Sequence, residues 1–110
     1  MSILKAGLAA FEAKDYARAF ELLKPFAEHG DAEVQCVIGS IYDLGLGLES
    51  NALEAIKWYK KSSEQGYGVA SNNLGTIYHM GREGVEMNRT KASEWYQKAR
   101  EQGFMHSPNI

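Results

Sequence analysis

The sequence predicts an all-α protein of about six helices, built as a series of helix pairs. Two observations lead to this fold class. Residues of the same type recur along the chain at intervals of 36 or 37 positions, which indicates a structural repeat. Within each repeat, apolar residues lie three or four positions apart, the spacing of one buried helix face. At 110 residues the chain is long enough for one domain that buries its own core.

The glycines mark the repeat, because Gly30 recurs as Gly66 and again as Gly103. The interval lengthens from 36 to 37 residues after one extra residue in the loop that contains Arg82 and Glu83. Other matched positions are Gly39 and Gly75, Tyr42 and Tyr78, Gly45 and Gly81, Gly47 and Gly84, Ala55 and Ala92, and the pairs Trp58-Tyr59 and Trp95-Tyr96. We therefore expect one repeat domain over residues 1–110, with an abbreviated unit at 1–30, full units at 31–66 and 67–103, and a truncated unit or C-terminal cap at 104–110.

Each full unit contains signals for two helices. The first helix has one apolar face, made by Val34, Ile38, Ile41 and Tyr42 in one unit and by Ala70, Leu74, Ile77 and Tyr78 in the next. The second helix begins after Asn51 or Asn88, whose side chain can accept a hydrogen bond from a backbone N–H of the first turn. It ends before Gly66 or Gly103, where a helix is commonly followed by a residue with positive φ.

Gly39 and Gly75 fall in the middle of the predicted first helices, where glycine costs about 1 kcal/mol relative to alanine. Close approach of the paired helix would offset this cost. We expect Gly39 to face Ala55 and Gly75 to face Ala92, because small residues on both helices let the two backbones come together.

The third unit carries a family pattern. It consists of Asn73-Leu74-Gly75-Thr76-Ile77-Tyr78-His79-Met80-Gly81, Gly84-Val85, and Lys91-Ala92-Ser93-Glu94-Trp95-Tyr96-Gln97-Lys98-Ala99-Arg100-Glu101-Gln102-Gly103. This pattern closely resembles the Sel-one-like repeat (SLR) family, a relative of the tetratricopeptide repeats. The second unit resembles it through Ile38-Gly39, Tyr42, Gly45-Leu46-Gly47, Ala55, Trp58-Tyr59 and Glu64-Gln65-Gly66. Residues 1–30 look more like a plain tetratricopeptide unit. Two departures from the family pattern are Asn51 and Asn88, where an acidic residue is usual, and the longer loop at Arg82-Glu83.

The resemblance implies an α-solenoid of antiparallel helix pairs, stacked into a right-handed superhelix, that serves as a protein-interaction scaffold without chemistry of its own. Members of the family are adaptors in bacterial envelope and secretion systems and in eukaryotic protein quality control, and some resemble immunity proteins. We therefore expect a non-catalytic adaptor that binds a partner peptide or protein on its concave helix face. The alternative is an immunity or inhibitor protein that neutralises a toxic effector.

Composition argues against several other classes. A net charge of −2 lacks the basic surface that a nucleic-acid-binding protein needs. No apolar run approaches the roughly 18 residues of a membrane span, and Lys5 and Glu12 interrupt the N-terminal stretch before it could act as a signal peptide. We expect a cytoplasmic protein with neither a nucleic-acid partner nor a membrane partner.

The sequence contains no recognisable catalytic or metal-binding pattern. His29, His79 and His106 lie in different units, without the spacing of a zinc site. Cys36 has no histidine in the same helical turn and is more typical of a small packing residue than of a nucleophile. We therefore expect no enzymatic activity, no metal and no cofactor.

Candidate partner-binding residues lie beside the buried stripe of the predicted first helices, which line the concave surface in helical-repeat solenoids. The third unit supplies Val69, Asn72, Asn73, Thr76, His79 and Met80, and the second unit supplies the equivalent Cys36, Ser40 and Asp43. Amides, hydroxyls and an adaptable methionine suit recognition of a peptide. For Asn73 a second interpretation stays open, in which its side chain caps or bonds a neighbouring helix.

Residues 104–110 begin a further unit and include the apolar Phe104, Met105 and Ile110. A solenoid end needs a polar covering. Either this tail folds back over the last helix pair, or a second copy of the chain covers the end and forms a dimer. We favour the first arrangement and hence a monomer.

Overall fold

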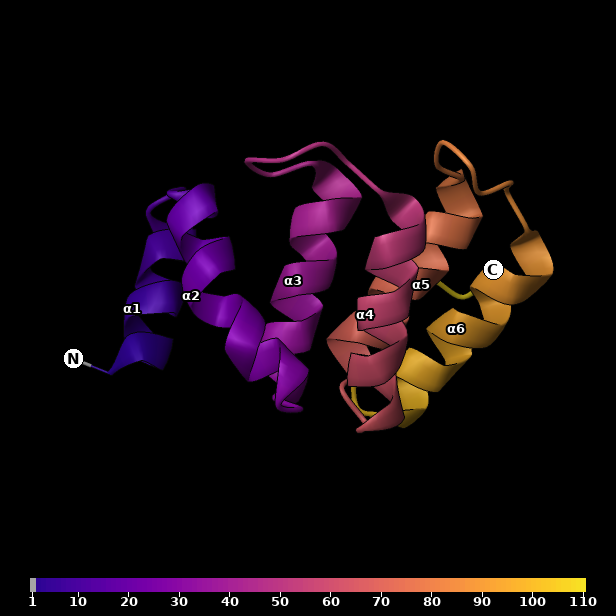
Figure 1. Ribbon diagram of the computed structural model, residues 1–110. Helices are drawn as coiled ribbons and strands as arrows, with labels where there is room; N and C mark the ends of the chain where they lie inside the picture. Colours follow the sequence, from indigo (N-terminus) through magenta and orange to yellow (C-terminus); the bar gives the residue numbers. More distant parts are fainter. Residues whose placement is uncertain (1) are drawn as a thin grey trace.

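Six helices make up the part of the chain that the structure describes. The computed structural model describes residues 2–110, so Met1, the first residue of the predicted first unit, lies outside the described residues. The helices are α1 (Ile3–Glu12), α2 (Tyr16–Glu28), α3 (Ala32–Leu44), α4 (Ala52–Glu64), α5 (Gly68–Met80) and α6 (Arg89–Glu101). They form three successive pairs in an elongated molecule of 42 × 28 × 22 Å (Figure 1). The predicted all-α fold of about six helices is confirmed.

Local signals determine where these helices begin and end. Asn51 Oδ1 accepts a hydrogen bond from the backbone N–H of Glu54 at 3.0 Å, and Asn88 Oδ1 accepts one from the backbone N–H of Lys91 at 3.0 Å. Both predicted asparagine caps are therefore present. The glycines that follow α2, α4 and α6 are Gly30, Gly66 and Gly103, with φ angles of 104°, 89° and 97°. A residue with a side chain adopts such angles only with strain.

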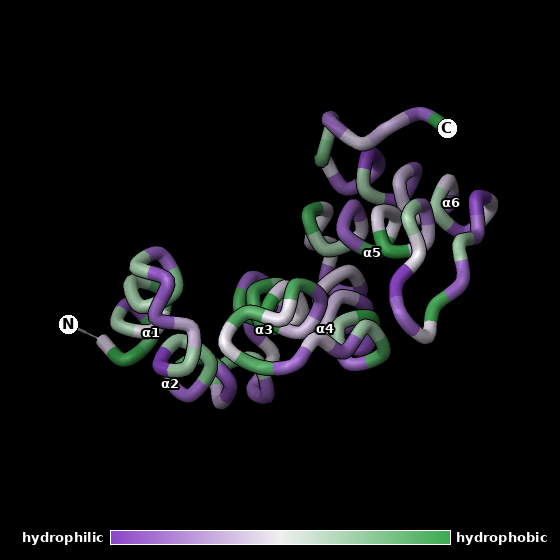
Figure 2. The backbone as a smooth tube through the Cα atoms, turned by 90° about the horizontal axis from the view of Figure 1, so that it is seen from above, coloured by the Kyte–Doolittle hydropathy of each residue, from purple (hydrophilic) through white to green (hydrophobic). Residues whose placement is uncertain are grey.

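Each helix packs against the next one along the chain. The pairs are α1 with α2, α3 with α4, and α5 with α6, and they stack through contacts of α2 with α3 and of α4 with α5. Seen from above in Figure 2, the stack curves, with α1, α3 and α5 on its inner side and α2, α4 and α6 on its outer side. We call the surface formed by α1, α3 and α5 the inner face. It corresponds to the concave surface on which partner-binding residues are predicted.

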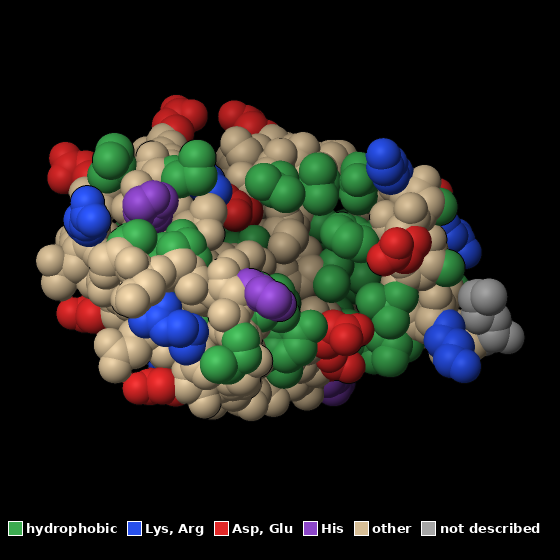
Figure 3. Space-filling view, turned by 180° about the vertical axis from the view of Figure 1, so that it is seen from behind, with side chains coloured by type: hydrophobic (Ala, Val, Ile, Leu, Met, Phe, Trp, Pro, Cys, Tyr) green, Lys and Arg blue, Asp and Glu red, His purple; other side chains and the backbone are tan. Residues whose placement is uncertain are grey.

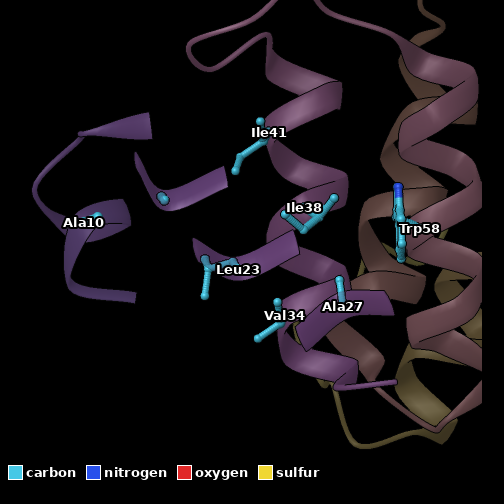
Figure 4. Packing of buried hydrophobic residues seen from close by; sticks show 8 residues of the cluster. Ala10, Leu23, Ala27, Val34, Ile38, Ile41 and Trp58 are labelled. Atoms are coloured by element: carbon cyan, nitrogen blue, oxygen red, sulfur yellow. The ribbon is translucent and has the colours of Figure 1, made fainter. Parts of the chain in front are cut away.

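Two clusters of buried side chains are shared between neighbouring pairs. The first lies mainly between α2 and α3, where Figure 4 shows Leu23, Val34 and Ile38, with Trp58 approaching from α4. The second joins α3, α4 and α5 and consists of Cys36, Ala55, Ile56, Tyr59, Ala70, Leu74 and Ile77. Because each cluster draws on more than one pair, the stability of each pair depends on its neighbour.

The mid-helix glycines pack against tyrosine rings of the paired helix. A Cβ atom added at Gly39 would lie 2.6 Å from Cδ1 of Tyr59, and one added at Gly75 would lie 2.5 Å from Cδ1 of Tyr96. The expected close approach of the paired helix is therefore present, but the predicted neighbour was wrong. The nearest side chain to each glycine is the tyrosine rather than the alanine one helical turn earlier, because the ring occupies the space that a glycine leaves open.

Side-chain amides at the ends of α4 and α6 join neighbouring pairs. Gln65 Nε2 donates to the carbonyl oxygen of Gly30 at 2.8 Å and to Gln35 Oε1 at 3.0 Å. Gln102 occupies the same place after α6, and its Nε2 donates to the carbonyl oxygen of Ser63 at 2.9 Å. The bonds to Gly30 and Ser63 span 35 and 39 residues of sequence and fix how one pair sits on the next.

The tail, residues 104–110, lies across the last helix pair. The Ser107 hydroxyl donates to Asn72 Oδ1 of α5 at 2.8 Å. From α6, the Ser93 hydroxyl donates to the carbonyl oxygen of Ile110 at 3.0 Å. The tail thus adopts the predicted folded-back arrangement, while the oligomeric state of the chain stays a prediction.

Candidate functional site

The nine predicted partner-binding residues all lie on α3 or α5, but they differ in exposure. Three are exposed, with Met80 at 65%: Val69, His79 and Met80. Five are half-buried: Ser40, Asp43, Asn72, Asn73 and Thr76. One, Cys36, is buried. The exposed group is the one whose side chains a partner can contact directly.

The hydroxyl residue after each mid-helix glycine is bonded to the facing tyrosine. Ser40 Oγ lies 3.0 Å from the Tyr59 hydroxyl, and Thr76 Oγ1 lies 3.1 Å from the Tyr96 hydroxyl. Thr76 gives its own proton to the carbonyl oxygen of Asn72 at 3.2 Å, so the Tyr96 hydroxyl donates to Thr76. These hydroxyls hold the paired helix in place, which is a different role from the predicted contact with a partner.

Asp43 bonds groups from two other parts of the fold. Its Oδ2 accepts from the Tyr59 hydroxyl at 3.3 Å, and its Oδ1 accepts from Arg82 Nε at 2.9 Å. Burial raises the pKa of Tyr59, so the phenol keeps its proton at neutral pH and can donate it to Asp43. The Ser40 hydroxyl then donates to the Tyr59 oxygen. Since the Asp43 side chain is only 7% exposed, it is occupied within the fold.

The two asparagines of α5 also have partners within the chain. Asn72 accepts the hydrogen bond from Ser107 of the tail, and Asn73 Nδ2 donates to the Cys36 sulfur at 3.7 Å. The second interpretation of Asn73, in which its side chain bonds a neighbouring helix, therefore agrees with this hydrogen bond to Cys36 of α3. Spacing along the sequence gave no signal for either contact, because the partners lie 35 and 37 residues away.

Cys36 must be removed from the candidate surface. It belongs to the second core cluster and is 5% exposed, so a partner cannot reach its thiol. Burial raises the pKa of this thiol to about 12, although the hydrogen bond from Asn73 acts in the opposite direction. The thiolate is the reactive form of cysteine, so the folded protein holds Cys36 in an unreactive state at neutral pH.

We predict that iodoacetamide at pH 8 leaves Cys36 unmodified while the protein is folded. With a thiol pKa of about 12, only about one molecule in ten thousand carries the thiolate at this pH, and the sulfur is also shielded. Intact-mass spectrometry over time measures the labelling. The same protein in concentrated urea is the control, and it should be alkylated at the rate of a free cysteine. Equal rates in both conditions would contradict the burial of Cys36.

The first unit also contributes to the inner face, although none of the nine predicted residues lies in it. A Cβ atom added at Gly7 would lie 2.6 Å from Leu23, so Gly7 holds in α1 the place that Gly39 and Gly75 hold in α3 and α5. Aligning these three glycines would have revealed the correspondence. In α1, the positions equivalent to those of Asn72, Thr76 and His79 are occupied by Leu4, Leu8 and Phe11.

These α1 residues make the N-terminal part of the inner face apolar. Leu4, Leu8 and Phe11 are partly buried against the first core cluster, as is Val37 of α3. Figure 3, which views the molecule from the side of α1, α3 and α5, shows hydrophobic side chains gathered around a hollow on this part of the face. The C-terminal part is more polar, so the inner face changes in character along the stack.

Two further hollows lie along the edge where residues 45–51 and 81–88 connect the helices, which we call the loop edge (Figure 1). The first has a volume of about 250 Å³ and is lined by charged side chains that include Asp43, Glu49 and Arg82. The second has a volume of about 330 Å³ and a mixed lining, in which the apolar Ile56 and Val85 lie beside the charged Glu86 and Lys91. Of the nine predicted residues, Asp43 alone lines either hollow.

The described residues also bear on metal binding and on membrane insertion. Among residues 2–110, no three side chains of histidine, cysteine, aspartate or glutamate lie together in a way that could hold a metal ion. Within the same residues, no helix combines the length and hydrophobicity that a membrane crossing requires. Location in the cytoplasm stays a prediction.

The stacked helix pairs, with cores and hydrogen bonds shared between neighbours, define an α-solenoid repeat protein. The Sel1 repeat family matches residues 6–31, 32–67 and 68–104, and the chain therefore belongs to this family. The first unit, whose sequence resembles a plain tetratricopeptide unit, is thus matched as a Sel1 repeat like the other two. Proteins of this family generally mediate protein–protein interactions and are typically non-catalytic.

Similar curated proteins are much longer than this chain. Chitin synthase regulatory factor 3 of Schizosaccharomyces pombe is 41% identical over 69 residues, which cover 62% of this chain and 7% of that protein. An F-box protein of Arabidopsis thaliana is 37% identical over 83 residues, covering 74% of this chain and 23% of that protein. DAP3-binding cell death enhancer 1 of Rattus norvegicus is 35% identical over 54 residues, covering 49% and 11%.

Solved structures share the same fold. A protective antigen of uropathogenic Escherichia coli that displays an SLR fold is 34% identical with a TM-score of 0.86, covering 92% of this chain and 22% of that one. A Sel1 repeat protein of Oxalobacter formigenes is 39% identical with a TM-score of 0.81, covering 90% of this chain and 40% of that one. The predicted family and solenoid fold are therefore confirmed.

Proposed function

We propose that this chain is a non-catalytic interaction module that binds a segment of a partner protein on its inner face. The observation that carries this proposal is the apolar surface of that face. Partly buried side chains of α1 and α3 surround a hollow, and two exposed residues at equivalent positions, Leu44 at 63% and Met80 at 65%, add apolar surface at the ends of α3 and α5. Apolar side chains gathered at the surface, as in Figure 3, mark interaction sites on soluble proteins.

The inner face sets the size and character of the partner segment. Three helices spaced by about 10 Å form a surface about 30 Å long, which accommodates about nine extended residues at ~3.3 Å each. The segment would place apolar side chains against Leu4, Leu8 and Val37, and more polar ones near His79. This arrangement replaces the predicted emphasis on the amides and hydroxyls of α5, which bond within the fold.

A protein partner agrees with the interactions that the family generally mediates. The names of two relatives, a chitin synthase regulatory factor and a DAP3-binding protein, also refer to another protein, although each name describes a chain of which this one spans 7% and 11%. For this chain the binding of a partner protein, a cytoplasmic location and the monomeric state are proposals. The alternative role as an immunity protein stays a prediction.

The test combines partner identification with a pair of matched variants. Cross-linking in the native cell followed by mass spectrometry names the partner, and calorimetry then measures its affinity for the purified chain. The double variant Leu44→Ser with Met80→Ser should weaken binding at least about tenfold, because burying each large apolar side chain contributes roughly 1.5–3 kcal/mol. Circular dichroism should show an unchanged fold, since both side chains are exposed.

The matched control is Lys60→Ser with Gln97→Ser, which changes two exposed side chains at equivalent positions of the outer helices α4 and α6. This control should bind the partner with undiminished affinity. If the control lost binding while the variant of the inner face kept it, the partner would bind at the outer helices and the proposal would be wrong.

A further inference from the structure

The hollow of about 330 Å³ on the loop edge belongs to a different surface from the inner face, and its wall contains both apolar and charged side chains. Leu53 and Ile56 of α4, Tyr78 of α5, and Val85 and Met87 of the following loop contribute to its wall. Leu53 and Met87, at 66% and 71% exposure, are among the most exposed large apolar residues of the described chain. A small hollow beside two such exposed apolar residues is a place where a single side chain from another molecule can pack.

The repeat itself shows which side chain belongs in this place. Thirty-six residues before Ile56 and Tyr78 stand Phe20 and Tyr42. Their rings pack edge to face, with centroids 5.7 Å apart and planes at 87°. In the first interface between pairs, a phenyl ring from α2 therefore covers the tyrosine of α3. In the second interface the equivalent residue of α4 is isoleucine, which has no ring to place there.

The loops that follow the helices of Tyr42 and Tyr78 correspond to each other in the same way. Leu48, which packs against the first core cluster, lies 37 residues before Val85 of the hollow. The second interface thus keeps the tyrosine and an apolar loop residue but lacks the phenyl group. In place of a ring, the ammonium group of Lys91 lies 5.2 Å from the centroid of the Tyr78 ring. The hollow lies where the first interface has a filled aromatic pair.

We propose that the hollow beside Ile56 and Tyr78 receives an aromatic side chain of the phenylalanine type from a partner protein. The ring would displace the exposed Lys91 side chain from the Tyr78 ring and pack there as Phe20 packs against Tyr42, with centroid distances in the 4.5–7 Å range of aromatic pairs. Leu53 and Met87 would contact the residues on either side of it. This site is independent of the inner face, so it holds or fails separately from the proposed function.

The first experiment uses N-acetyl-L-phenylalaninamide as the probe. Titration into the ¹⁵N-labelled chain should cause saturable shifts of the backbone amide signals of residues 53, 56, 78 and 84–88. N-acetyl-L-leucinamide should bind about two- to tenfold more weakly, because it cannot form the aromatic pair. The absence of saturable shifts at these residues, or equal affinity for both amides, would overturn the proposal, as would shifts confined to the inner face.

Two variants exchange the residues of the two interfaces. Ile56→Phe supplies the missing ring from within the chain, so the shifts at the loop edge should disappear while the fold is kept. Phe20→Ile should open the equivalent hollow and produce a second set of saturable shifts near residues 42 and 46–50. If Phe20→Ile unfolds the chain, Ile56→Phe decides alone, and undiminished binding to that variant would refute the site.

A second copy of the chain is the competing occupant. In that case the amide signals of residues 53, 56, 78 and 84–88 would shift on simple dilution without any probe, and light scattering would detect a dimer. Signals that are independent of protein concentration, together with saturable binding of the phenylalanine amide, support the aromatic side chain of a partner.

Discussion

Replacing Gly75 with leucine should lower the free energy of unfolding by about 3 kcal/mol, the upper part of the usual range for overpacked cores. A Cβ atom at this position would lie 2.5 Å from the Tyr96 ring, and further carbons would extend into the same space. Leucine recovers about 1 kcal/mol of helix propensity relative to glycine, which does not offset this overlap. For a chain of this size the melting temperature should fall by about 12 °C, as measured by calorimetry or circular dichroism.

The matched control for Gly75→Leu is Gln97→Leu, an exposed position one residue beyond Tyr96 on α6. It introduces the same side chain into the same helix pair without facing α5, so its melting temperature should change by less than about 2 °C. A melting temperature of Gly75→Leu equal to that of the unmodified chain would show that the tyrosine ring can move aside and that the contact does not restrict this position.

Removing the Arg82 side chain should lower the free energy of unfolding by about 2 kcal/mol. Arg82→Ala leaves the Asp43 carboxylate, whose side chain is 7% exposed, without the guanidinium that lies 2.9 Å away. Loss of one partner of a buried ion pair is strongly destabilising because the remaining charge is poorly solvated. We place the effect below the range for fully buried pairs because the Arg82 side chain is 23% exposed. Urea unfolding at neutral pH measures it.

A double-mutant cycle separates this ion pair from other effects of the substitution. Asp43→Asn keeps an oxygen that can accept from Tyr59 but removes the charge, so adding it to Arg82→Ala should recover about 1 kcal/mol. Arg89→Ala, which removes an exposed arginine at the start of α6, should be nearly neutral. Purely additive effects of the Asp43 and Arg82 substitutions would show that the pair does not couple the loop to α3.

Helix positions and caps could be predicted from the sequence because their causes are local. The asparagine caps act over three residues, and the helix-ending glycines act on their own backbone angles. The repeat then extended each local signal to the next unit. For this reason the number and order of the helices, and the family, could be predicted from the sequence alone.

The partners of individual side chains were not accessible in the same way. Choosing between alanine and tyrosine as the neighbour of Gly39 requires the rotation of one helix against the other, which the apolar spacing does not determine. The bonds of Asp43 to Arg82 and of Asn73 to Cys36 join residues 39 and 37 positions apart. Polar residues beside a buried stripe therefore suggested a partner surface, whereas several of them bond within the fold.

The contact between tyrosine and glycine has a consequence for how such a chain can change its partner. The residue directly after each mid-helix glycine is hydrogen-bonded to the paired helix, as Ser40 is to Tyr59. The residue five positions after the glycine, Leu44 or Met80, has an exposed side chain. In the first unit, the positions equivalent to Ser40 and Tyr59 are occupied by two apolar residues, Leu8 and Leu23. Evolution or design can therefore alter binding through single substitutions at the exposed position. A substitution at the hydrogen-bonded position requires a matching substitution of the residue that it contacts on the paired helix.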